Sequence, residues 1–176
     1  SDKNFSMNKS KNQIQYFLIN TDIKTYKKRH FKYWLQTGFA YLTPTPKPRS
    51  NLNLVSTSNR REILDIVKNQ YLNNLKKLRI GDYIFAYDSE FEKIKGHIVG
   101  VGRIIEEWDG ILYANEPHAY YRRDELFYKI HIEWVVEKII SYEEIKKAGL
   151  HITPNAFSEI KPQEAKELLC GKSMSF

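Results

Sequence analysis

Three segments in the second half of the chain have the residue pattern of β-strands, and they constrain the fold more than any other feature. Residues 83–87 (YIFAY) and 96–105 (GHIVGVGRII) are short and apolar, and they are rich in β-branched or aromatic residues. Residues 127–136 alternate instead, so that Ile130 and Trp134 share one face of the strand. Strands that follow one another in this way predict a mostly antiparallel sheet.

The first half of the chain predicts a strand and two helices separated by a long loop. Residues 14–19 (IQYFLI) have the pattern of a buried strand, and residues 23–36 have that of a helix that ends at Gly38. Residues 43–59 are rich in Pro, Ser and Asn and predict a loop. Residues 60–76 repeat apolar side chains at helical spacing.

Two short helices, near residues 141–148 and 162–169, complete the expected elements. Neither an internal repeat nor a Gly/Ser linker divides the chain. We therefore expect a flexible arm over residues 1–12 and one domain over residues 13–176. The expected fold class is α+β, a mixed and mostly antiparallel β-barrel flanked by helices.

The composition excludes several classes of protein. A chain of 176 residues, 41% of them hydrophobic, can bury a core without disulfides or metals. Its single cysteine, Cys170, excludes disulfides and cysteine-based zinc sites within the chain. No apolar run approaches the roughly 18–20 residues of a membrane span, and the first residues lack the apolar stretch of a signal peptide. We expect a cytoplasmic protein without a membrane partner.

The positive charge is concentrated in the first half of the chain. Overall, 28 Lys and Arg stand against 21 Asp and Glu, which gives a net charge of +7. Residues 1–79 hold 16 of the basic residues and only 4 of the acidic ones. This asymmetry is typical of proteins that bind a polyanion such as nucleic acid, although a solvated lysine-rich surface has the same composition.

Residue combinations typical of catalytic sites are missing from the sequence. The five His residues do not fall at metal-ligand spacings, and neither a GxSxG motif nor a complete phosphate-binding loop is present. Paired acids such as Glu106 and Glu107 are more typical of a solvated face than of an acid–base pair. We therefore expect a binding module that is not an enzyme and that holds no metal or cofactor.

The stretch HFKYWLQTGFAY, residues 30–41, carries five aromatic residues behind a basic run. Tyr33 and Trp34 are adjacent on the predicted helix and therefore point about 100° apart. Both cannot face the core fully, while Phe31, Leu35 and Phe39 supply apolar anchors. Core packing alone is one interpretation of Trp34, and stacking against a flat ligand is the other.

The order of these segments resembles the PUA-like superfamily, specifically its EVE and YTH branches. FLINTD leads into KYWLQTGFA, and a basic helix precedes LRIGDYIFAY, KGHIVGVGRI and a strand that ends in Glu-Trp. The resemblance covers residues 14–170 and implies a β-barrel that holds one flipped base in an aromatic cage. YTH domains read N6-methyladenine in RNA, and EVE-like domains read modified DNA bases in restriction systems of the McrB type. Aromatic stacking and hydrogen bonds would offset the cost of unstacking the base.

The resemblance also implies a set of site residues. The base-binding pocket is expected to contain Asn20, Thr21, Asp22, Trp34, Tyr121 and Leu126. Asp22 could read an amino group of the base or could equally cap the following helix. Tyr121 and Leu126 stand where a YTH reader tends to have aromatic walls, which weakens the match to N6-methyladenine. Trp108 and Tyr120 are reserve candidates for a wall.

Basic residues near this pocket are expected to contact phosphates, which position a strand without reading its sequence. The candidates are Lys24, Lys28, Lys47, Arg49, Arg60, Arg61, Arg122 and Arg123. Arg60 and Arg61 stand at the start of a predicted helix, where a cation opposes the helix dipole. A phosphate bound there would resolve that conflict.

The expected function is recognition of a methylated DNA base, with N6-methyladenine slightly ahead of 5-methylcytosine. The chain would be the DNA-specificity domain of a McrB-type restriction protein and would have a nuclease subunit as a further partner. The C-terminal CGKSMSF has the character of a cut through a longer chain. One alternative is an RNA-binding YTH-like N6-methyladenine reader or an RNA-modification accessory domain. Another is a protein-interaction or regulatory domain with an unused pocket.

Overall fold

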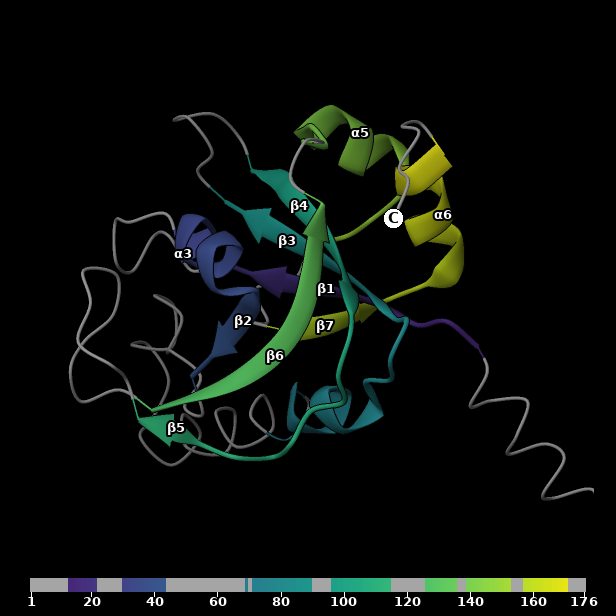
Figure 1. Cartoon of the computed structure of the whole chain (residues 1–176). Coiled ribbons are helices and arrows are strands. Elements are labelled where there is room, and N and C mark those ends of the chain that lie inside the picture. Colours follow the sequence, from purple (N-terminus) through teal and green to yellow (C-terminus); the bar gives the residue numbers. More distant parts are fainter. Residues whose placement is uncertain are drawn as a thin grey trace, which may run out of the picture.

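In the part of the chain that the structure describes, seven strands form a central curled sheet, and helices pack on both of its faces (Figure 1). The computed structural model describes residues 13–21, 30–43, 69, 71–89, 96–114, 126–135, 139–152 and 157–170. Within these ranges the expected α+β class is confirmed. The expected arm over residues 1–12 and most of the Pro-rich loop over residues 43–59 lie outside the described residues.

The elements follow the predicted order with three additional short strands. The strands are β1 (Tyr16–Asn20), β2 (Phe39–Leu42), β3 (Tyr83–Asp88), β4 (His97–Ile104), β5 (Tyr113–Ala114), β6 (Leu126–Val135) and β7 (Phe157–Ile160). The helices are α3 (His30–Thr37), α5 (Tyr142–Lys147) and α6 (Pro162–Cys170), and residues 71–77 are also helical. The sequence did not predict β2, β5 and β7, because two to four residues are too few to show a period.

The sheet is mixed and mostly antiparallel, as expected. Its strand order is β2-β6-β4-β3-β1-β7, and β5 pairs with β6 beside this path. β1 and β3 run parallel, while the other pairs are antiparallel. Because β1 and β3 are parallel neighbours, their carboxyl ends lie at the same edge of the half-barrel.

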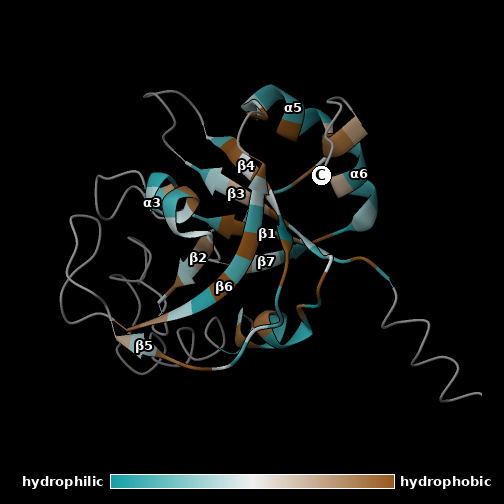
Figure 2. Ribbon diagram, viewed as in Figure 1, coloured by the Kyte–Doolittle hydropathy of each residue, from teal (hydrophilic) through white to brown (hydrophobic). Residues whose placement is uncertain are grey.

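Residues of β1, β3 and β4 enter two hydrophobic layers, one on each face of the sheet. Phe17 of β1 packs in the concave layer, together with α3 and the helical residues 71–77. Leu18 packs in the opposite layer, which α5 and α6 cover. Figure 2 shows the resulting hydrophobic residues along the strands and the hydrophilic residues along α5 and α6. Ile130 and Ile132 of β6 belong to the concave layer, which confirms the alternation predicted for this strand.

Local signals in the sequence explain where two helices begin or end. Gly38 follows α3 with a φ of 74°, a left-handed conformation that favours glycine, and its N–H donates to the carbonyl of Trp34 at 2.9 Å. The predicted end of this helix at Gly38 is confirmed. Ser141 and Glu144 form a capping box that begins α5.

Asp82 joins the start of β1 to the start of β3. Its buried carboxylate accepts hydrogen bonds from Gln15 N–H at 2.9 Å, from Gln15 Nε2 at 3.0 Å and from Arg79 N–H at 2.8 Å. Burial raises the pKa of this carboxyl, and the hydrogen bonds only partly counteract that effect. Asp82 therefore closes the turn that the sequence predicts before β3.

Candidate nucleic-acid interface

Three aromatic rings from α3 and β6 meet on the concave side of the sheet. The ring centroids of Phe31 and Trp134 lie 5.0 Å apart, with planes at 89°. The rings of Phe31 and Trp34 lie 6.4 Å apart at 76°, and those of Trp34 and Trp134 lie 6.3 Å apart at 21°. These three residues, hereafter the aromatic trio, contact one another through two edge-to-face pairs and one stacked pair.

Two glycines of β4 make room for the trio. A Cβ at Gly100 would lie 2.2 Å from the ring of Phe31, and a Cβ at Gly102 would lie 2.9 Å from the ring of Trp134. The GVG motif that the resemblance singled out therefore has a steric role at this site. The rings approach the β4 backbone at positions where any other residue would have to displace them.

The ring of Trp34 is enclosed in this conformation. Its side chain is only 1% exposed, and it belongs to the concave core. A base held between Trp34 and Trp134 would need about 7 Å between the ring planes, which is two van der Waals contacts of about 3.5 Å. The centroids are 6.3 Å apart, so a base does not fit between the two indoles as they stand.

Trp134 is the more exposed member of the stacked pair. It is half-buried, and its Nε1–H donates a long hydrogen bond of 3.4 Å to the carbonyl of Phe39. Sequence reasoning assigned Trp134 to packing on the alternating face of β6 and missed its stacking on Trp34. No pattern in the sequence indicates that α3 packs against β6.

Polar residues lie where β1 and β3 end together. The N–H and the hydroxyl of Thr21 both donate to the carbonyl of Tyr87, at 2.9 and 3.1 Å. Asn20 is half-buried and faces Tyr87 across the parallel pair, and Asp88 is buried one residue further on. Burial raises the pKa of the Tyr87 phenol, and nearby Tyr142 and Asp88 raise it further. Figure 1 shows α3 beside this edge of the sheet.

Leu126 lies far from the aromatic trio along β6. It is 46% exposed and opens the strand, whereas Trp134 stands eight positions later. Eight residues of strand span roughly 26 Å at about 3.3 Å each. The described structure therefore brings Trp34 together with Phe31 and Trp134, and it does not bring Trp34 together with Leu126.

The remaining expected site residues lie outside the described part of the chain. These are Asp22 and Tyr121 of the expected pocket, the reserve candidate Tyr120, and all eight phosphate candidates: Lys24, Lys28, Lys47, Arg49, Arg60, Arg61, Arg122 and Arg123. Their roles stay predictions. Among the described residues, no three His, Cys, Asp or Glu side chains gather as metal ligands.

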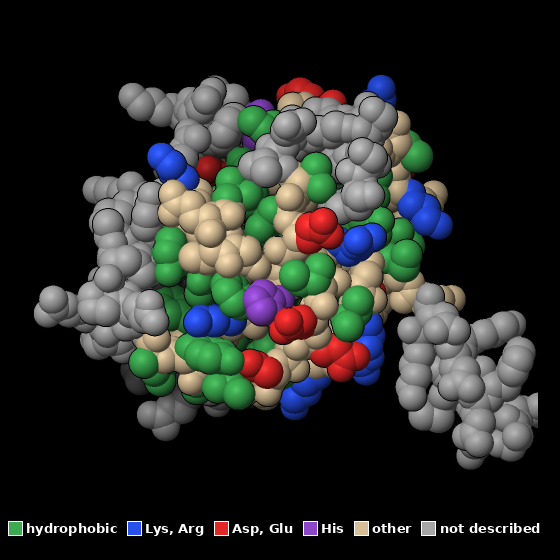
Figure 3. Space-filling view, viewed as in Figure 1, with side chains coloured by type: hydrophobic (Ala, Val, Ile, Leu, Met, Phe, Trp, Pro, Cys, Tyr) green, Lys and Arg blue, Asp and Glu red, His purple; other side chains and the backbone are tan. Residues whose placement is uncertain are grey.

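The outer face of β2 and β6 carries a second group of aromatic side chains that sequence reasoning missed. Phe39 and His131 face each other across the two strands, with stacked rings 4.1 Å apart. Lys129 Nζ lies 5.3 Å from the ring centroid of Phe39 and 4.3 Å from that of Tyr113. Figure 3 shows hydrophobic, basic and histidine side chains over β6, with acidic ones beside them. The alternation of residues 127–136 was the available signal, because it places Lys129 and His131 opposite the core face.

None of the helices in the described ranges is long and apolar enough to cross a bilayer.

A family model described as the EVE domain matches residues 41–170 of the chain. Among solved structures, that of a hypothetical protein from Leishmania major has a TM-score of 0.53 at 10% identity, over 92% of this chain and 96% of that one. The NMR structure of Rpa0253 from Rhodopseudomonas palustris has a TM-score of 0.44 at 16% identity, over 90% and 92%. No curated protein matches the chain significantly. At such low identity the Leishmania structure supports the fold alone.

Proposed function

Because the chain belongs to the EVE domain family, whose PUA-like members are binding modules for nucleic acid, we propose that it recognises a modified base flipped out of its strand. The observation that carries this proposal is the aromatic trio beside the polar ends of β1 and β3. A flipped base needs a stacking surface and hydrogen-bonding groups at its edge. In this proposal the ring of Trp34 supplies the stacking surface, and the side chain of Asn20 supplies hydrogen-bonding groups at the edge of the base.

In this proposal the base takes the place of Trp134 against Trp34. Trp134 is half-buried and its hydrogen bond is long, so it is the ring of the pair that moves. Its stacking on Trp34 contributes about 0.5–1.5 kcal/mol beyond burial. Stacking of a base on an aromatic side chain contributes about 1–3 kcal/mol. The free energy of replacing the Trp134 ring by a base on Trp34 is therefore close to zero or favourable.

The proposed base is N6-methyladenine ahead of 5-methylcytosine. An asparagine amide donates and accepts at once, and it can pair with the N6 and N7 atoms of adenine. Asn20 ends β1 at the edge where the proposed pocket opens. N6-methylation leaves one N6–H for such a bond, and it adds a methyl group that gains from burial among aromatic rings.

The proposed ligand is DNA, and the proposed context is the specificity domain of a McrB-type modification-dependent restriction protein that acts with a nuclease subunit. The choice of DNA and the McrB-type context are supported by the family match together with Tyr121, which stands where YTH readers of methylated RNA tend to have Trp. The net charge of +7 suits a polyanionic partner.

The test is a binding panel at fixed salt concentration with four ligands of equal length. Three are DNA duplexes: one with a single N6-methyladenine, one with a single 5-methylcytosine, and one unmodified. The fourth is single-stranded RNA with N6-methyladenine. We expect the tightest binding to the N6-methyladenine duplex. Tighter binding to the RNA would favour an RNA reader, and equal weak binding to all four would contradict the proposal.

A further inference from the structure

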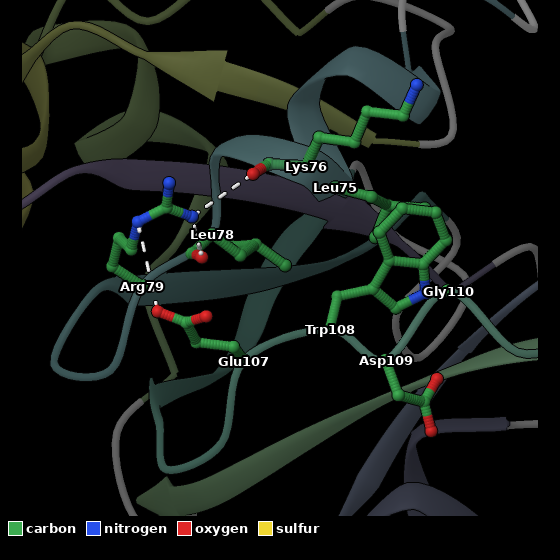
Figure 4. Close-up of a pocket in the computed structure, with 8 residues that line it drawn as sticks. All are labelled: Leu75, Lys76, Leu78, Arg79, Glu107, Trp108, Asp109 and Gly110. Carbon is green, nitrogen blue, oxygen red and sulfur yellow. Dashed lines mark hydrogen bonds and ion pairs between the residues drawn. The ribbon is translucent and has the colours of Figure 1, made fainter.

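A groove separate from the aromatic trio lies between the helical residues 71–77 and the segment that follows β4. Its volume is about 240 Å³. Leu75 and Leu78 provide apolar lining, and Trp108 lines it from the other segment. Figure 4 shows Lys76 and Trp108 on one side of the groove, with Arg79 and Glu107 on the other.

Trp108 is held in place from behind. Its ring meets that of Tyr128 edge to face, with centroids 5.2 Å apart at 86°, and Tyr128 belongs to the concave core. Trp108 itself is half-buried, and its buried Nε1–H has no hydrogen-bond partner among the described residues. A large aromatic ring that lines a groove and is fixed by the core is a ready surface for a flat ligand.

The charged residues around the groove differ in how firmly they are engaged. Arg79 Nη1 donates to the carbonyls of Lys76 and Leu78 at 3.1 and 2.9 Å, so this guanidinium is tied to the backbone. Glu107 is 61% exposed and lies 3.8 Å from Arg79 Nε, which is a loose ion pair. The carboxylate of Glu107 therefore keeps capacity to accept a hydrogen bond from a ligand.

We propose that this groove is a second subsite that binds one nucleotide, with the base stacked on Trp108. Glu107 accepts a hydrogen bond from the exocyclic amino group of the base, and Lys76 contacts the phosphate. A carboxylate only accepts hydrogen bonds, so the subsite favours adenine, cytosine or guanine, which carry an exocyclic amino group. Uracil and thymine have no such group, and their one Watson–Crick donor, N3–H, lies between two carbonyl oxygens that repel a carboxylate. This inference rests on the proposed function in one respect, that the nucleotide belongs to the same strand as the flipped base.

The size and place of the groove fit a flanking nucleotide. A volume of about 240 Å³ lies below the roughly 300–1,000 Å³ of sites for drug-sized ligands and suits a single base. Tyr128, behind Trp108, stands six residues before Trp134 on β6. Six residues of strand span roughly 20 Å, so one strand several nucleotides long would reach both sites.

The experiment is calorimetric titration of the full chain with AMP and with UMP, neither of which carries a modified base. We expect saturable binding of AMP, at least severalfold tighter than that of UMP. Trp108→Leu should weaken AMP binding by roughly tenfold or more, because the stacking surface is lost. Glu107→Gln replaces half of the carboxylate by a donor and should remove the preference for AMP while the protein stays folded.

Three results would overturn the subsite: no saturable AMP binding, equal affinity for AMP and UMP, or AMP affinity that Trp108→Leu leaves unchanged. If Trp108→Leu does not fold, the exposed position 107 still decides the outcome through Glu107→Gln. Because only unmodified mononucleotides are used, failure here leaves the modified-base proposal standing. Likewise, if the protein bound modified and unmodified DNA equally, the modified-base proposal would fail while AMP binding at the groove would be unaffected.

Discussion

Trp34 and Trp134 lie nearly parallel on the concave side of the sheet, with ring centroids 6.3 Å apart and planes inclined by 21°. The two rings differ in exposure, because Trp34 is 1% exposed whereas Trp134 is half-buried. If a base replaces Trp134 during binding, substitutions at the two positions must have opposite effects on affinity.

Trp134→Ala should therefore strengthen binding to modified DNA. The substitution removes the ring that the base must displace. The stacking of that ring on Trp34 contributes about 0.5–1.5 kcal/mol, so its removal should raise the affinity by about two- to tenfold. Fluorescence anisotropy with a labelled duplex measures the effect. A loss of affinity in Trp134→Ala would show instead that this ring is a wall of the pocket.

Trp34→Ala should destabilise the domain strongly. Truncation of a buried tryptophan costs about 3–5 kcal/mol, because both transfer energy and a cavity contribute. Urea denaturation gives the free energy of unfolding, and Trp134→Ala is the matched control, with a smaller expected loss because its ring is only half-buried. Equal losses at both positions would contradict the burial described for Trp34.

Gly100→Ala should destabilise the domain through Phe31. The new Cβ would lie 2.2 Å from the Phe31 ring, so ring or backbone must move, at a cost of about 1–3 kcal/mol. Truncation of the ring should relieve the clash, so the loss caused by Gly100→Ala should shrink in a Phe31→Ala background. Gly149→Ala is the control for this rescue: a Cβ there meets nothing within 4 Å, and its cost comes from backbone strain at a φ of +78°, so Phe31→Ala should leave that cost unchanged. Purely additive losses in the double variant would argue against this contact.

Tyr71→Phe should change the pH dependence of stability at alkaline pH. The buried Tyr71 hydroxyl donates to the carbonyl of Thr43 at 2.7 Å, and burial raises its pKa well above the ordinary 10.0. The unfolded chain releases this proton as the pH rises through 10, whereas the folded chain retains it. The contribution of Tyr71 is therefore fully present below pH 10 and is lost above it.

Thermal unfolding of the wild type and of Tyr71→Phe between pH 8 and pH 11 measures this contribution. Tyr71→Phe should cost about 1 kcal/mol at pH 8. The difference between the two proteins should narrow above pH 10. A constant difference over this range would mean that the phenol ionises equally in both states.

The sequence predicted the fold better than the site because the two depend on different signals. Alternation along residues 127–136 predicted β6 and its core face, and Gly38 predicted the end of α3. These signals are local, and they act through the backbone. Strands as short as β5, with two residues, carry too little pattern to be predicted.

The site depends on contacts between distant segments. Trp34 and Trp134 are 100 positions apart, and the curvature of β6 and the packing of α3 against β4 bring them together. The sequence favoured Trp34 as the stacking residue but not its partner. It also grouped Leu126 with Trp34, although Trp34 stacks on Trp134 near the end of β6 and Leu126 stands at its start, because spacing along the chain does not reveal how a strand is oriented in space.

The central claim is that Trp34 stacks on a methylated base. Its most direct test is the ratio of affinities for two DNA duplexes that differ only in one N6-methyl group, measured for the wild type and for Trp34→Phe at equal salt. Burial of one methyl group contributes about 0.8 kcal/mol, so the account predicts a ratio of about four or more for the wild type. It also predicts a ratio close to one for folded Trp34→Phe. A wild-type ratio of one, or a ratio that Trp34→Phe leaves unchanged, would contradict the account.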